Sequence, residues 1–69
     1  MYKLPDLELV AEKVHESWLL NKRALGVTSR LSETGEELMV SYSQLSEPAK
    51  ELDRVTVRAV YAAIEAASQ

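Results

Sequence analysis

Two segments about two dozen residues apart place the strongest constraint on how this chain of 69 residues folds. The first, residues 11–18, carries the only histidine and the only tryptophan, His15 and Trp18, on adjoining positions of a predicted helix. The second, residues 42–54, has the residue order of a short extended stretch that leads into another helix. The sequence therefore predicts one mainly α domain spanning residues 1–69, with two principal helices.

The first helix has clear signals at both ends. Asp6 follows a proline and is a good N-cap, and Gly26 is suited to a left-handed C-cap. The cations Lys22 and Arg23 suit the negative end of the helix dipole. Apolar residues recur between these ends at spacings of three and four: Leu7, Val10, Ala11, Val14 and Trp18. We predict a helix from about Asp6 to Leu25, with Trp18 as its main core aromatic or as part of a ligand site.

The connection that follows, residues 27–43, has no helical period. Residues 33–35 are typical of a turn, and residues 38–42 are short, apolar and compatible with a strand. We expect a short hairpin or two extended arms between the two helices.

Two residues predict the start of the second helix: Ser46 is a suitable N-cap, and Pro48 is tolerated only in the first turn of a helix. An apolar stripe follows, formed by Leu52, Val55, Ala59, Val60, Ala63, Ile64 and Ala67. Because Asp53 is a possible second cap, one continuous helix and a kinked or two-part helix both fit.

Composition limits how such a domain is stabilised. A chain this short buries only about 60% of its unfolded surface. It has no cysteine and a single histidine, which argues against disulfides and a zinc site, so we expect no metal and no cofactor. Well-packed helices and self-association remain as ways to reinforce the domain, so we expect self-association.

The charge pattern excludes several partners. The net charge is −3, and Lys22–Arg23 is the only pair of adjacent basic residues, so we expect no binding to duplex nucleic acid. No apolar run approaches the ~20 residues that span a bilayer, and the start of the chain lacks the apolar region of a signal peptide. We expect a cytoplasmic protein without a membrane partner and, since the sequence opens with Met1, a complete chain.

No catalytic constellation is visible, so we predict that the protein is not an enzyme. Ser17 lies two residues from His15 and points away from it on a helix, which removes the one nucleophile–base pair. His15 fits either a partly buried structural ring or a ligand contact and proton switch. Asp53 and Arg54 fit either a recognition pair or a cap with an ion-pair partner.

In this order and separation, the two segments resemble the RyR domain, the small repeat of ryanodine receptors that also occurs singly in bacterial and phage proteins. The resemblance covers about Leu9 to Ala63 and rests on Ala11, Glu12, Val14, His15, Trp18, Gly26, Val40, Tyr42, Leu45, Glu47, Lys50, Asp53 and Arg54. The chain departs from the family after Gly26, where Val27 and Thr28 replace an aromatic residue, and at Ser41, where the family has proline.

The resemblance implies a small, mainly helical regulatory domain, which occurs in the receptors as tandem pairs with approximate two-fold symmetry. Because this chain has one copy and a limited core, we expect a symmetric homodimer in which a second protomer supplies the missing repeat. We therefore predict a non-enzymatic regulatory or adaptor module that binds a protein partner or a small ligand such as a nucleotide derivative. The alternative is a purely structural or inhibitory interaction factor, such as a phage accessory protein, with no small-molecule site. An aromatic plane and a cation would hold a base and a phosphate, which selects His15, Trp18, Arg23, Tyr42 and Arg54 as candidate ligand contacts.

Overall fold

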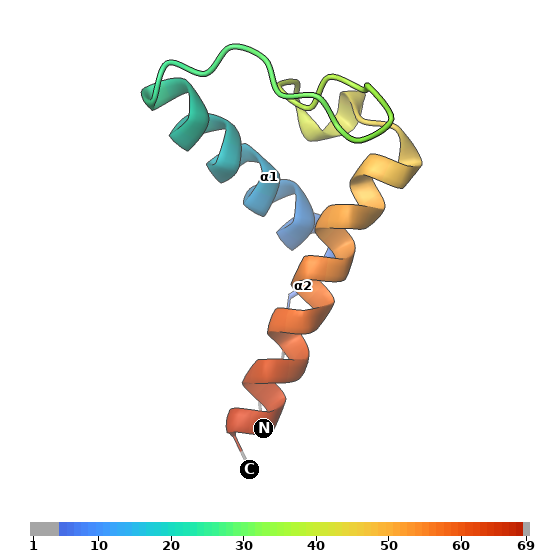
Figure 1. Ribbon diagram of the computed structural model, residues 1–69. Coiled ribbons are helices and arrows are strands. Elements are labelled where there is room, and N and C mark those ends of the chain that lie inside the picture. The colour runs from blue at the N-terminus through green and yellow to red at the C-terminus, as the bar shows by residue number, and fades with distance from the viewer. Residues whose placement is uncertain (1–4, 69) are drawn as a thin grey trace.

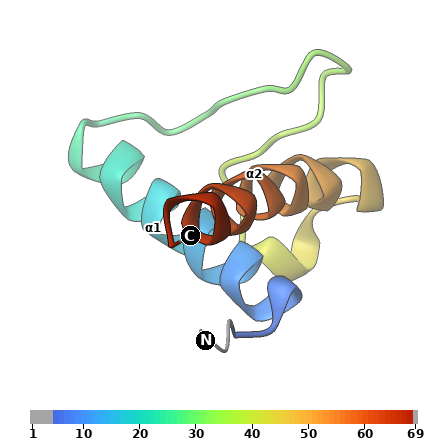
Figure 2. The same ribbon diagram turned by 90° about the horizontal axis from the view of Figure 1, so that it is seen from below.

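Two helices cross as a V in the computed structural model, which describes residues 5–68 (Figure 1). They are α1 (Leu7–Ala24) and α2 (Glu47–Ala67), and a short 3-10 turn, η1 (Tyr42–Gln44), precedes α2. Seen along α2 in Figure 2, the connecting segment arches to one side of both helices. The prediction of a mainly α fold with two principal helices is confirmed. The start of the chain, where we expect no signal peptide, lies outside the described residues.

The ends of α1 form as their residue types predict. The Leu9 backbone N–H donates to the Asp6 carboxylate at 3.1 Å, which caps the first turn. At the other end the Val27 N–H donates to the Lys22 carbonyl at 2.9 Å, while Gly26 adopts a φ of 82°. This is a Schellman motif, and it needs the left-handed conformation that glycine adopts without steric cost. Both ends agree with the prediction to within one residue.

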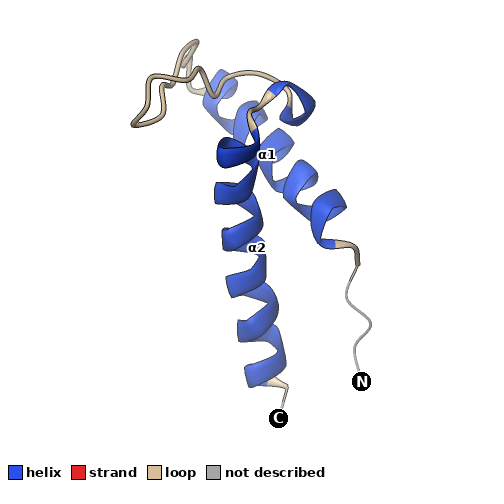
Figure 3. Cartoon of the chain, turned by 90° about the vertical axis from the view of Figure 1, so that its right-hand side faces the viewer, coloured by secondary structure: helices blue, strands red, loops and turns tan. Residues whose placement is uncertain are grey.

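Irregular backbone connects the helices, as Figure 3 shows by its loop colouring. Within residues 5–68 the only strand-like pairing is an isolated bridge between Leu31 and Glu37, so no hairpin of regular strands forms. The predicted turn at residues 33–35 is present, and Gly35 adopts a φ of 88°. The Glu37 carboxylate accepts bonds from the backbone N–H groups of Arg30 and Met39, at 2.7 and 3.1 Å. These bonds lower the pKa of Glu37 and replace those that a strand partner would supply.

The second helix is one continuous element. Ser46 caps it by accepting a bond from the Ala49 N–H, and Pro48 lies in the first turn. Asp53 is therefore an interior residue of α2, and the interpretation of Asp53 as a second cap is wrong. Its carboxylate lies against His15 of α1 instead.

The helices contact one another through residues four positions apart on each. On α1 these are the buried residues Ala11 and His15. On α2 the stripe runs through the buried residues Ala49 and Val57, with half-buried Asp53 and Tyr61 in the same row. Packing of such rows favours a crossing of roughly 50°, consistent with the V.

Tyr42 is the buried aromatic residue, with only 5% of its surface exposed. It packs in the core with Ala11, Leu45, Ala49 and Val57. Trp18 is half-buried and lies at the edge of the helix crossing. The interpretation of Trp18 as the main core aromatic is therefore wrong, because η1 inserts Tyr42 between the helices.

The predicted apolar stripe of α2 does not form the contact with α1. Leu52 is 62% exposed and Val55 54% exposed, and of the seven predicted residues only Ile64 is half-buried. The helix is rotated so that Asp53 and Arg54 reach α1, where they pair with His15 and Glu8. Across residues 5–68, neither helix is long and apolar enough to cross a membrane.

Candidate functional site

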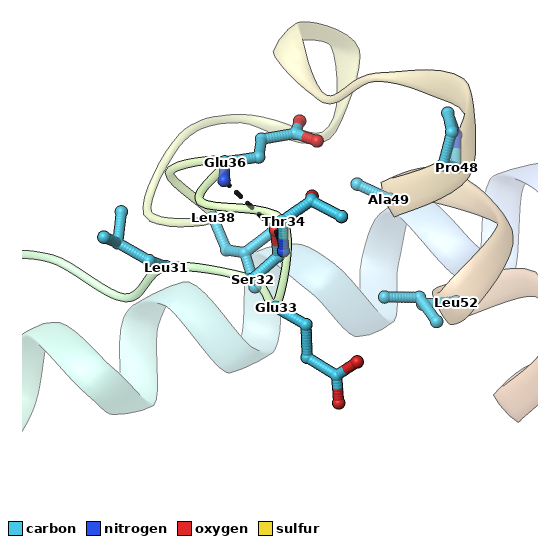
Figure 4. Close-up of a pocket in the computed structure, with 9 residues that line it drawn as sticks. All are labelled: Leu31, Ser32, Glu33, Thr34, Glu36, Leu38, Pro48, Ala49 and Leu52. Carbon is cyan, nitrogen blue, oxygen red and sulfur yellow. Dashed lines mark hydrogen bonds between the residues drawn. The ribbon is translucent and has the colours of Figure 1, made fainter.

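An apolar groove runs between the connecting segment, α2 and the middle of α1. It consists of two adjoining pockets that share Leu38, Ala49 and Leu52. The larger, of about 500 Å³, lies between residues 31–38 and the first turns of α2 (Figure 4). The smaller, of about 140 Å³, lies between α1 and α2 and includes Trp18. Because Leu52 belongs to both pockets and is mostly exposed, it is the natural contact point for a bound molecule.

His15 forms the polar part of the smaller pocket and is only 4% exposed. Its Nε2 lies 2.7 Å from the Val40 carbonyl oxygen, which can only accept, so Nε2 must carry a proton. Its Nδ1 lies 3.5 Å from the Asp53 carboxylate. The indole ring of Trp18 stacks on the imidazole, with ring centroids 5.5 Å apart. Both nitrogens are thus engaged, and the ring connects α1 to the connecting segment and to α2.

The His15–Asp53 pair needs one more proton than a neutral imidazole and a carboxylate hold. A lone pair on Nδ1 would face a negative oxygen, so either the imidazole is doubly protonated or Asp53 carries the proton. Burial raises the pKa of Asp53, and the charge of His15 opposes that rise. The arrangement suits a structural connection better than proton transfer to a ligand, because neither nitrogen is free.

A second polar cluster holds the other side of the helix crossing. The Arg54 guanidinium donates to both oxygens of Glu8, at 2.7 and 3.0 Å, and the Tyr42 hydroxyl donates to Glu8 at 2.7 Å. These two donors, Arg54 first, lower the pKa of Glu8 to about 2. Burial, and then the bond to Glu8, raise the pKa of Tyr42 to about 12. Arg54 also pairs with Glu47 at 3.0 Å and with Glu51 at 3.4 Å, so three carboxylates occupy it.

The five candidate ligand contacts do not lie in one place. His15 and Trp18 line the smaller pocket, while Tyr42 is buried beneath them, with its ring centroid 6.1 Å from that of His15. Arg54 belongs to the cluster on the other side, and neither Arg54 nor Arg23 lines either pocket. Arg23 is exposed in the last turn of α1. The geometry therefore separates the aromatic plane from both of the cations chosen to hold a phosphate.

Several groove residues escaped the sequence reasoning. Leu31 and Leu38 are isolated apolar residues in a polar connection, and nothing in their spacing indicates that they meet α2. Leu52 was predicted only as part of the apolar stripe of the second helix. Asp53 was interpreted as a cap. Its contact with His15 could not be predicted from the sequence, because the two residues lie 38 positions apart.

No family model, curated protein or solved structure matches this chain. The fold and the groove define a small two-helix domain with an apolar groove beside the helix crossing.

Proposed function

We propose that the protein is a non-enzymatic regulatory or adaptor module that binds a protein partner in the apolar groove. The observation that supports this is the pair of adjoining pockets centred on Leu52, which stays 62% exposed. Contiguous exposed apolar surface with a polar rim is typical of protein interaction sites. The resemblance to the RyR domain favours the same class.

The charges around the groove favour a protein partner over a nucleotide derivative. No lysine or arginine lines either pocket, and Glu33 and Glu36 lie at the rim of the larger one. Arg54 is held by three carboxylates and is not available to a phosphate. A nucleotide derivative is the second candidate, because Trp18 and His15 offer an aromatic stack.

The expected partner presents apolar side chains that fill the two pockets and basic residues that meet the acidic rim. An amphipathic helix has this chemistry, since its residues three and four apart share one face. The net charge of −3 also favours a basic partner. The alternative, a structural or inhibitory factor without a small-molecule site, agrees with the same groove if the bound partner is the protein it inhibits.

Affinity capture with matched variants tests the proposal. Leu52→Asp places a charge in the centre of the groove, whereas Leu20→Asp makes the same change at a site on α1 that is 68% exposed and lines neither pocket. We expect a protein that is captured by the wild type and by Leu20→Asp and lost with Leu52→Asp. A captured protein that binds Leu52→Asp as well as it binds the wild type would contradict the proposal.

A thermal-shift screen over nucleotides and cyclic nucleotides tests the second candidate. A ligand present at 100 times its dissociation constant stabilises the folded state by about 2.7 kcal/mol. A shift of that size that Trp18→Ala abolishes would favour the nucleotide derivative over the protein partner.

A further inference from the structure

We propose that two copies of this chain pair antiparallel through the outward face of α2, the side turned away from α1. This face consists of Val55, Ala59, Ala62 and Ala66, all exposed, and Leu52 lies at its N-terminal end, where it also lines the groove. It contains no charged residue, although α2 carries seven charged side chains elsewhere. A surface helix normally turns its charges to solvent and its apolar side to the protein. In α2 apolar residues lie on both sides, because Ala49 and Val57 are buried while the outward face is apolar and exposed.

The outward face has the spacing of a helix-pairing seam. Leu52, Val55, Ala59, Ala62 and Ala66 alternate steps of three and four residues, which is the heptad pattern of two packed helices. Val55 is 54% exposed, so the face is more than a row of alanines. The C-terminal turns of α2, which extend past α1 in Figure 3, carry most of this seam.

The charges beside the seam point to a second copy in the antiparallel direction. Glu51, Arg58 and Glu65 lie seven residues apart along one edge, while Thr56 and Ala63 make the other edge uncharged. In a parallel pair, each charged edge would meet an uncharged edge. In an antiparallel pair the charged edges meet one another, and their alternating signs become complementary.

The same charges select the register. With Ala59 opposite Ala62 of the second copy, Arg58 meets Glu65 of that copy on both sides of the two-fold axis. Glu65 has no ion pair among residues 5–68, and Arg58 is half-exposed with only Glu51 as partner. If the second copy slid along the seam by one full heptad, Arg58 would face Arg58 of that copy, which is repulsive. A further shift would pair Arg58 with Glu51, which its own chain already uses.

This pairing is independent of the groove and goes beyond the proposed function. The paired stretch runs from Val55 to Ala66, and Leu52 stays beyond its end, available to the groove. A monomeric result would leave the capture experiment with Leu52→Asp unaffected.

Single cysteines locate the seam directly, because the chain has no cysteine of its own. In the proposed register the two Ala62 positions are offset by about 5 Å along the helices, whereas the two Leu52 positions are roughly 25 Å apart. We expect Ala62→Cys to form a disulfide-linked dimer under mild oxidation and Leu52→Cys to remain at the background set by exposed Leu20→Cys. Cross-linking of Leu52→Cys above that background, or no specific cross-link with Ala62→Cys, would overturn the proposal.

A charge exchange tests the pairing without cysteines. Arg58→Glu alone and Glu65→Arg alone each oppose like charges across the seam, and we expect each to weaken dimerisation at least roughly tenfold. An equimolar mixture should restore a heterodimer in analytical ultracentrifugation, since both edges are then complementary. Circular dichroism of each variant checks that it remains folded. A wild-type monomer at high micromolar concentration, or no recovery in the mixture, would overturn the proposal.

Discussion

The inward face of α2 combines buried apolar residues with charged side chains, whereas its outward face carries no charge. The inward face carries Lys50, Asp53 and Arg54, all half-buried and near a partner from another part of the chain. The outward face carries no charge and is exposed. The comparison teaches that apolar periodicity locates a surface to be covered without saying which neighbour covers it. Here the face that carries Val57, Asp53 and Arg54 meets α1, and the uncharged face remains exposed.

The polar contacts between α2 and the rest of the chain fix the orientation of the helix more than they stabilise the fold. Each ion pair of Arg54 includes a carboxylate that water reaches, and such pairs contribute little to stability. The few buried apolar residues, Val57, Leu19 and Tyr42 among them, must therefore supply most of the stability of the isolated chain. Four predictions test this division, beginning with the largest effect.

Removing the buried aromatic ring should be the most damaging change. Tyr42→Ala leaves a cavity in the core and removes a donor from Glu8, so we expect a loss of roughly 3–5 kcal/mol in the free energy of unfolding. Trp18→Ala should cost only about 1–2 kcal/mol, because half-buried Trp18 has less surface to lose. Urea denaturation of both variants measures the difference. An equal or larger effect at Trp18 would restore Trp18 as the main core aromatic.

The two valines of α2 provide a matched pair across its faces. Val57→Ala removes methyl groups from the inward core and should cost about 2 kcal/mol. Val55→Ala on the outward face should cost less than about 0.5 kcal/mol in dilute solution, where chains are unpaired. Denaturation at low protein concentration gives both values, and similar losses would show that the faces do not differ as described.

The loss of stability at acid pH should depend on Glu8. Its pKa is lowered from 4.5 to about 2 in the folded chain, so its contribution is present above pH 4.5 and is lost as the pH falls through about 2. Glu8→Gln removes this titration, and we expect the unfolding free energy of the variant to change less between these two values. Thermal melts at stepwise lower pH test this, with exposed Glu33→Gln as the control. Equal slopes in both variants would contradict it.

The change of stability with pH that is due to Asp53 should have the opposite sign to that of Glu8, and it should be the smallest of the four effects. Since burial raises the pKa of Asp53 above 3.8, stability that is present below that value is lost as the pH rises through the higher folded value. Asp53→Asn abolishes this dependence and lets an amide N–H donate to Nδ1 of His15. We expect a change within about 1 kcal/mol at neutral pH, measured by denaturation. A large loss would show that the carboxylate charge itself holds His15.

The candidate site was only partly accessible from the sequence. His15 and Trp18 could be chosen because they are unique residues of suitable chemistry on one helix. The groove centre at Leu52 could not be found, since it depends on how the connecting segment folds against α2. Arg54 was selected as a cation for a phosphate, and its three carboxylate partners lie at separations from three to 46 residues.

The sequence by itself determined where the helices begin and end. Asp6, Gly26, Ser46 and Pro48 act within a turn of their own position, so their effect follows from residue type alone. Only the tertiary structure decided which face of α2 meets α1 and which aromatic ring fills the core. Those outcomes depend on contacts between distant residues, such as Glu8 with Arg54 and His15 with Asp53, whose partners no local pattern reveals.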